Sequence, residues 1–165
     1  MSVVVVIGGA SALLGAAGVS VGSIAVGTVA EALLSKLETK TSDVNNTVIY
    51  PSIFRKMNIV KTALSNLAVD ARVNSNNHVL GQIDEVKVEC VFNSNRKAID
   101  MFFIGATESK AQNIVTKIEE EYGNVIQELV YKKLKSDATN KGLTLESEQL
   151  TEDKSIVLTY NINQF

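Results

Sequence analysis

The chain is poor in the residues that protein chemistry most often uses. Its 165 residues include one cysteine, Cys90, one histidine, His78, one proline, Pro51, and no tryptophan. A single cysteine excludes an internal disulfide and a cluster of thiolate ligands, and a single histidine excludes a two-histidine metal site. We therefore expect no metal, no cofactor and no catalytic residues, and a protein that is not an enzyme.

Charge is missing from the N-terminal part of the chain. The first charged side chain is Glu31, and all 16 Lys and Arg and all 18 Asp and Glu lie at or after it. The net charge of the whole chain is -2. Binding to nucleic acid needs a concentrated basic face, so we predict no nucleic-acid partner.

The uncharged segment is rich in small residues, and six of the ten glycines fall at or before Gly27. We predict that residues 1–34 form an apolar helix, whose first 30 residues would span roughly 45 Å. Small side chains recur along it at spacings of three and four, which places them in one stripe suited to close helix packing. The predicted helix-packing interface consists of Gly8, Ser11, Gly15, Gly18, Gly22 and Ala25.

Several functions are compatible with this segment. A bilayer core needs about 20 apolar residues, so a membrane span is our first interpretation and a buried core helix of a soluble oligomer is the second. A secretory signal is less favoured because no basic residue precedes Lys36. A phosphate loop is also less favoured, because Gly8 to Leu13 does not match G-x-G-x-x-G and no G-K-[ST] follows.

The rest of the chain has the alternating and helical patterns of a mixed domain. A polar linker over residues 35–46 is followed by strand-like Val48–Tyr50 and by a helical pattern over Ile53–Leu67, with Ser52 as its N-cap. Further elements are indicated by periodicity and turn residues: strands at Val69–Val73, His78–Ile83, Val86–Phe92 and Ala98–Ile104, a long helix after Thr107 that ends near Gly142, and a hairpin of Leu143–Gln149 and Ser155–Asn161.

These patterns predict an α+β fold in which an N-terminal apolar helix is followed by an antiparallel sheet with two packed helices. The expected organisation is the apolar segment 1–34, the linker 35–46 and an α+β domain over 47–165. Gly123 interrupts the long helical pattern and marks either a bend or the junction of two helices.

Polar residues outside the apolar segment have ordinary explanations. His78 lies beside an asparagine-rich turn and is expected to be exposed, and Cys90 lies on the apolar face of its strand. Consecutive glutamates at 119–121 are typical of a solvated helix face. Lys132, Lys133 and Lys135 suit the C-terminal part of a helix, and a contact with anionic lipid is the alternative.

Part of the sequence resembles a family of unknown function from cyanobacteria and plastids, the conserved hypothetical chloroplast frame thirty-five proteins. The shared residues, between about 52 and 161, are Ser52-Ile53-Phe54, Leu67, Gly81, Asp100-x-Phe102, Tyr122, Val130, Gly142-Leu143-x-Leu145-Glu146 and Asp153-x-Ser155-Ile156-x-Leu158. The chain differs from the family in lacking tryptophan and in its apolar segment. The resemblance implies an α+β fold and brings no reaction and no catalytic residue.

Two functions are consistent with the sequence. The first is a non-enzymatic, self-assembling protein whose N-terminal helix packs through the small-residue stripe in or against a membrane, with a cytoplasmic α+β head for assembly or partner recognition. The second is a soluble, cytoplasmic homo-oligomeric scaffold or binding protein with the apolar segment as its buried assembly core. In both, the expected partner is another copy of the chain, joined in the first by membrane lipid.

Overall fold

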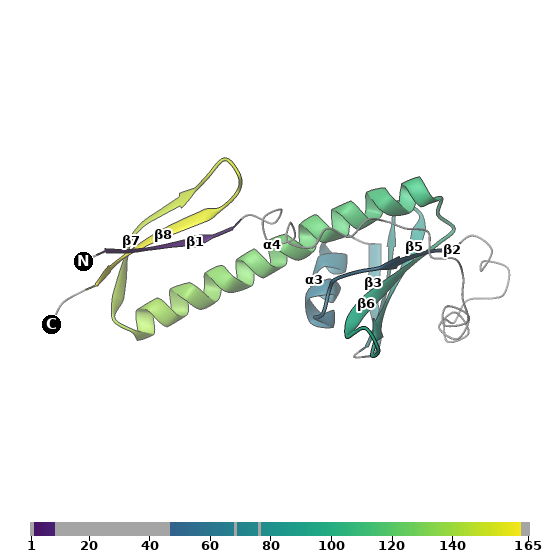
Figure 1. Cartoon of the computed structure of the whole chain (residues 1–165), viewed down its shortest axis with the longest axis horizontal. Coiled ribbons are helices and arrows are strands. Elements are labelled where there is room, and N and C mark those ends of the chain that lie inside the picture. The colour runs from purple at the N-terminus through teal and green to yellow at the C-terminus, as the bar shows by residue number, and fades with distance from the viewer. Residues whose placement is uncertain (1, 9–46, 68, 76, 163–165) are drawn as a thin grey trace. The chain divides into compact units, whose positions relative to one another are not determined.

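The structure is a computed structural model of the chain, and it describes residues 2–8, 47–67, 69–75 and 77–162 (Figure 1). These residues form two helices and eight strands arranged in two antiparallel sheets. The chain divides into two compact units. The first contains the three-stranded sheet and the long helix from Glu119 onward, and the second contains the five-stranded sheet and all described residues from Thr47 to Ile118.

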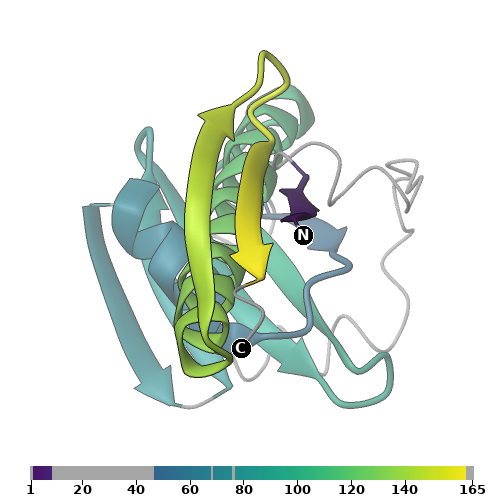
Figure 2. The same cartoon turned by 90° about the vertical axis from the view of Figure 1, so that its left-hand side faces the viewer.

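The first unit is built from both ends of the chain. Its strands are β1 (Ser2–Ile7), β7 (Leu143–Leu150) and β8 (Ile156–Ile162), in the order β1-β8-β7. Its helical part belongs to α4 (Glu108–Asn140). In Figure 2 the sheet lies in front of this helix, with β8 between the other two strands. Residues at the start of the sequence therefore share a sheet with residues near its end.

Alternate residues of this sheet form the core of the first unit. Leu158 and Tyr160 of β8 are buried, as are Ile7 of β1 and Ala138 of α4. Successive side chains of a strand point to opposite faces, so the intervening residues lie on the other face of the sheet. Partly buried side chains complete the cluster: Val5, Tyr131, Leu134, Leu143, Leu145 and Ile156.

The second unit contains a four-stranded antiparallel meander and one further strand that precedes it in the sequence. The strands β3 (Val69–Ser75), β4 (His78–Ile83), β5 (Val86–Asn93) and β6 (Ala98–Ile104) pair in sequence order. The strand β2 (Thr47–Pro51) then adds beside β6. Asp84 and Glu85 both have positive φ, 48° and 68°, which gives the tight two-residue connection that suits the twist of β4 and β5.

One face of this sheet is wholly apolar and carries the core. Val79, Cys90 and Met101 are paired across three strands, and all three are fully buried. The helix α3 (Met57–Leu67) packs against β3 and β4. Its inward residues are Val60, Ala63 and Leu64, and the first half of α4 contributes Ala111, Ile114, Val115 and Ile118.

The ends of α4 follow their sequence signals. The Thr107 hydroxyl accepts a hydrogen bond from the Lys110 N–H at 3.3 Å, as an N-cap residue does. Gly142 has φ of 70°, the left-handed conformation that ends many helices. Between these residues α4 is one uninterrupted helix of 33 residues, so Gly123 is not the junction of two helices.

The expected N-terminal helix is wrong where the structure describes it. Ser2–Ile7 form a β-strand that pairs antiparallel with β8, from Ser2 opposite Asn161 to Ile7 opposite Ile156. The physical reason is local as well as tertiary, because four valines and an isoleucine are β-branched and favour strands over helices. Gly8 has no regular secondary structure, and Ser11, Gly15, Gly18, Gly22 and Ala25 lie outside the described residues.

The expected single sheet is also wrong, since the C-terminal hairpin joins β1 in a sheet of its own. The predicted strands of the meander and the hairpin are confirmed. Ser52 is not an N-cap, because α3 begins only at Met57 and the Ser52 hydroxyl donates to the Ile99 carbonyl instead. Within the described residues, neither helix is long and apolar enough to cross a membrane.

Two of the leucines in the first unit's hairpin give a matched test of this core. Leu158 is fully buried and Leu150 is 72 % exposed. We expect Leu158→Ala to lower the free energy of unfolding by about 2–5 kcal/mol, because it leaves a cavity. Leu150→Ala should change it by less than about 0.5 kcal/mol. Urea unfolding followed by circular dichroism measures both, and equal effects would contradict the described packing.

Candidate functional site: an exposed apolar edge strand

Among the described residues the two sheets end in four edge strands, and three of them carry features that hinder pairing with another chain. β3 has two register shifts and an exposed Asp70–Arg72 ion pair. β2 is only five residues long and ends in Pro51. β7 has a register shift between Leu145 and Ser147 and carries glutamates. Bulges, charges, proline and short length are the usual means of protecting a sheet edge.

The fourth edge strand, β1, has none of these features. Its sequence SVVVVI contains no charge, proline or glycine, and its register with β8 has no shift. Val3, Val4 and Val6 are 38 %, 60 % and 62 % exposed. A regular, apolar and uncharged edge is the kind that pairs with a further strand. We take β1 as the candidate functional site of the described chain.

Hydrogen bonds fix both ends of β1. Ser2 donates its hydroxyl proton to the Glu146 carboxylate on β7 at 3.0 Å. At the other end, the Gln127 side-chain amide on α4 donates to the Gly8 carbonyl at 3.2 Å and to the Lys154 carbonyl at 2.7 Å. The single Gln127 amide thus ties the end of β1 to the turn before β8. The exposed valines are therefore held on an ordered strand rather than on a loose end.

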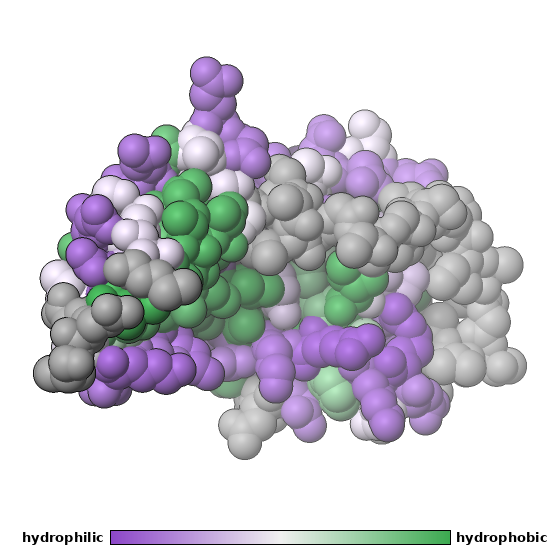
Figure 3. Space-filling model, turned by 60° about the vertical axis from the view of Figure 1, so that its left-hand side comes forward, coloured by the Kyte–Doolittle hydropathy of each residue, from purple (hydrophilic) through white to green (hydrophobic). Residues whose placement is uncertain are grey.

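Two of the exposed valines, Val4 and Val6, alternate with residues that belong to the core. Val5 and Ile7 pack in the cluster beneath α4, whereas Val4 and Val6 lie on the opposite face, beside Thr159 and Val157 of β8. In Figure 3 a hydrophobic area lies toward the left of the view, with polar residues along its lower side. Apolar surface is thus gathered in one place on this face.

Polar contacts join the other edge of the same sheet to α4. The Tyr131 hydroxyl lies 2.9 Å from both Glu148 carboxylate oxygens, and the Lys135 ammonium lies 2.7 Å from that hydroxyl. The Tyr131 hydroxyl and the Glu148 carboxylate raise the pKa of Lys135. Burial raises the pKa of the nearby Tyr160 hydroxyl. This cluster anchors β7 to the helix and leaves β1 as the apolar edge.

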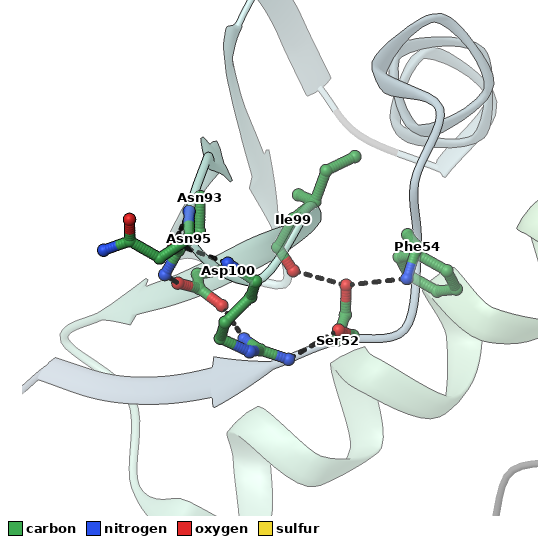
Figure 4. A network of polar contacts seen from close by, with 7 residues as sticks. Ser52, Phe54, Asn93, Asn95, Ile99 and Asp100 are labelled. Atoms are coloured by element: carbon green, nitrogen blue, oxygen red, sulfur yellow. Dashed lines mark hydrogen bonds and ion pairs between the residues drawn. The ribbon is translucent and has the colours of Figure 1, made fainter.

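A second polar cluster lies in the second unit, where β2 ends (Figure 4). The buried Asp100 carboxylate forms an ion pair with the Arg96 guanidinium and accepts a hydrogen bond from the Asn93 amide at 2.7 Å. Arg96 also donates to the Ser52 carbonyl at 2.9 Å. The Ser52 hydroxyl joins the Ile99 carbonyl at 2.5 Å and the Phe54 N–H at 3.1 Å. Every group has a partner inside the cluster, which indicates a structural role.

A buried carboxylate lies on the face of β5 opposite Cys90. The Glu89 side chain is only 1 % exposed, and its oxygens lie 2.7 Å from the Lys87 ammonium and 3.5 Å from His78 Nε2. Lys87 and Glu89 form an ion pair, and neither Glu89 oxygen has a hydrogen-bond partner among the described residues. Within the described residues, no group of three or more His, Cys, Asp or Glu could hold a metal ion.

The second unit also has a surface hollow of about 390 Å³ at the start of α3. Its lining consists of Arg55, Lys56, Met57, Asn58, Asn77 and Phe92. Arg55 and Lys56 are both exposed, and exposed cations occur widely on protein surfaces. The hollow therefore gives weaker grounds for a function than β1 does.

The structure places the other candidate residues of the sequence as follows. The Cys90 side chain is buried in the core, as predicted, whereas the His78 side chain is only 18 % exposed, which corrects the expected exposed position. Glu120 is exposed and its two neighbours are half-buried. Lys132 pairs with Glu128 at 2.5 Å and Lys135 with Glu148, so these two lysines have partners within the chain.

Sequence reasoning included β1 in the apolar segment and assigned it to a helix, so the edge strand was missed. The signal was the run of four consecutive valines before Gly8-Gly9, which is typical of a strand that leads into a turn. No protein-family model, curated protein or solved structure matches this chain. The resemblance to the chloroplast-frame family accordingly stays a prediction.

The buried thiol gives a test of the second unit's packing. Burial raises the pKa of Cys90 to about 12, and the thiolate is the reactive form. We expect the native protein not to react with a thiol reagent at pH 8, and to react with one equivalent after unfolding in urea. Absorbance of the released chromophore measures the reaction, and rapid labelling of native protein would contradict the described core.

Proposed function

We propose that this chain is a non-enzymatic, homo-oligomeric scaffold or binding protein that assembles through its N-terminal apolar segment. The observation that supports the proposal is β1, an ordered, uncharged edge strand whose Val4 and Val6 are 60 % and 62 % exposed. Covering apolar surface is favourable by roughly 25 cal/mol per Å². Binding of a second chain over these valines is favoured by this free energy. The backbone of the second chain can form hydrogen bonds with the backbone of β1 in the same step.

The stiffness of the strand favours such assembly. Valine has few side-chain rotamers, so ordering it at an interface costs little conformational entropy. β1 is already held by β8 and by the bonds at Ser2 and Gly8, so its backbone does not have to be ordered on binding. Preorganisation of this kind lowers the cost of association.

The same features support assembly over insertion in a membrane as the role of this part of the segment. A helical span that begins at Val3 cannot coexist with the pairing of Ser2–Ile7 to β8. Strand residues in hydrocarbon also need all their backbone groups paired. Assembly of protein chains provides that pairing in water.

Lysines on the outer face of β1 test this proposal. We expect wild-type protein to be oligomeric and Val4→Lys/Val6→Lys to be monomeric at the same concentration, because charges on the covered edge prevent association. Size-exclusion chromatography with light scattering gives the mass of each. Circular dichroism and a urea midpoint check that the variant is folded.

A matched control is Val73→Lys, which places a lysine at an exposed valine of β3, the edge strand with two register shifts and an exposed ion pair. This variant should keep the wild-type mass. A wild-type protein that is monomeric at every concentration up to the millimolar range would refute the proposal. Full chain that leaves solution for membranes in a carbonate-resistant form would favour the membrane function instead.

A further inference from the structure

The edge of β1 that faces away from β8 is the place where a further strand can add. In an antiparallel sheet the backbone N–H and C=O groups of alternate residues point to opposite sides of the strand. One set of β1 groups is directed toward β8. The other set lies along the outer edge of the three-stranded sheet, since among the described residues β1 is terminal in the order β1-β8-β7.

We infer that β1 pairs antiparallel with β1 of a second copy of this chain, around a twofold axis centred on Val5. This inference rests on the proposed function and specifies its interface. It predicts one continuous six-stranded sheet in the order β7-β8-β1-β1-β8-β7. The apolar edge of each copy is then covered by the identical edge of the other.

The chemistry of β1 selects a second copy over another kind of partner. A different protein is usually distinguished by complementary charges at the interface, and β1 offers no charge to complement. An uncharged strand that is apolar at every position after Ser2 is complementary to itself in either direction. The twofold, self-complementary arrangement is also the commonest form of protein dimer.

Symmetry restricts the register of this pairing. Residues directly opposite each other in antiparallel strands have their side chains on the same face. A twofold axis perpendicular to the sheet places the α4 helix of each copy on the same face of the combined sheet. Core-facing residues of one β1 must therefore lie opposite core-facing residues of the other. Val5 and Ile7 face the core cluster, and Val4 and Val6 face outward, so odd residues pair with odd residues and even with even.

Among the centres that satisfy this rule, Val4 and Val5 each pair five residues of one strand with five of the other, and composition distinguishes these two. Centring on Val5 places Val3 opposite Ile7 and Val4 opposite Val6, so the two most exposed valines cover each other. Centring on Val4 places Ser2 opposite Val6 and leaves a polar hydroxyl against an exposed valine. The register centred on Val5 buries more apolar surface and is the one we assign.

The arrangement also fixes the size of the assembly. After β1 has paired, the two outer strands of the combined sheet are both β7. Its register shift and its glutamates hinder pairing with a further strand. Such an edge resists further pairing. The pairing therefore closes at a dimer and does not continue into a fibre.

Disulfide formation between full-length chains tests the partner and the register together. Val4→Cys and Val6→Cys chains, one with a tag that changes its mass, are mixed and oxidised with copper phenanthroline. Directly opposite residues are within disulfide reach, and diagonal neighbours at about 7–8 Å between Cα atoms are beyond it. Native Cys90 is buried and does not compete. We expect Val4→Cys to join Val6→Cys at least about tenfold faster than either chain joins itself.

Each other outcome has a definite meaning. Rapid joining of Val4→Cys to itself, with Val6→Cys unreactive toward itself, overturns the register by moving the centre to Val4. Rapid joining of each chain to itself indicates parallel pairing and overturns the antiparallel interface. If no pair reacts while light scattering shows an oligomer, this inference fails and the proposed function stands. If the wild-type chain is monomeric throughout, both fail.

Discussion

The first unit depends on the pairing of β1 with β8. The two strands are paired over six residues, from Ser2 with Asn161 to Ile7 with Ile156. Without β1, the unit would be a single β7–β8 hairpin on one helix, and two-stranded sheets are marginal in water. β1 also contributes Ile7, with Val5 beside it, to the cluster around Leu158 and Tyr160. The strand that completes this core on one face is the same strand that exposes valines on the other.

Local patterns were sufficient for much of the second unit. The strand β5 alternates apolar with mostly polar residues, and the turns before β4 and before β6 are rich in asparagine, so local patterns located these elements. Cys90 was predicted to be buried because it follows Val86 and Val88 on the apolar face, and it is buried. The signals at Thr107 and Gly142 likewise marked the ends of α4 correctly. Each of these inferences needed only neighbours within a few residues.

The errors came from pairings between distant residues. The strand β1 is matched with β8 across about 150 residues of sequence, and nothing in its own pattern of consecutive valines identifies that partner. A run that is apolar on both sides reads equally as a buried strand or as part of a helix. The same limit hid the candidate site, because an edge strand is defined by the absence of a neighbour in the sheet. Ser52 was misassigned because the polar groups that it joins, on Ile99 and Arg96, are more than 40 residues away.

The division of the chain has a consequence for the order in which it folds during synthesis. The described residues of the second unit all lie between Thr47 and Ile118, so their contacts can form as soon as that stretch leaves the ribosome. The first unit must wait for β8, which lies near the end of the sequence. Contacts between residues far apart in sequence form slowly because a long loop has to be closed first. Through this interval the valines of β1 lack their partner β8, and transiently exposed apolar strands make a nascent chain prone to aggregation.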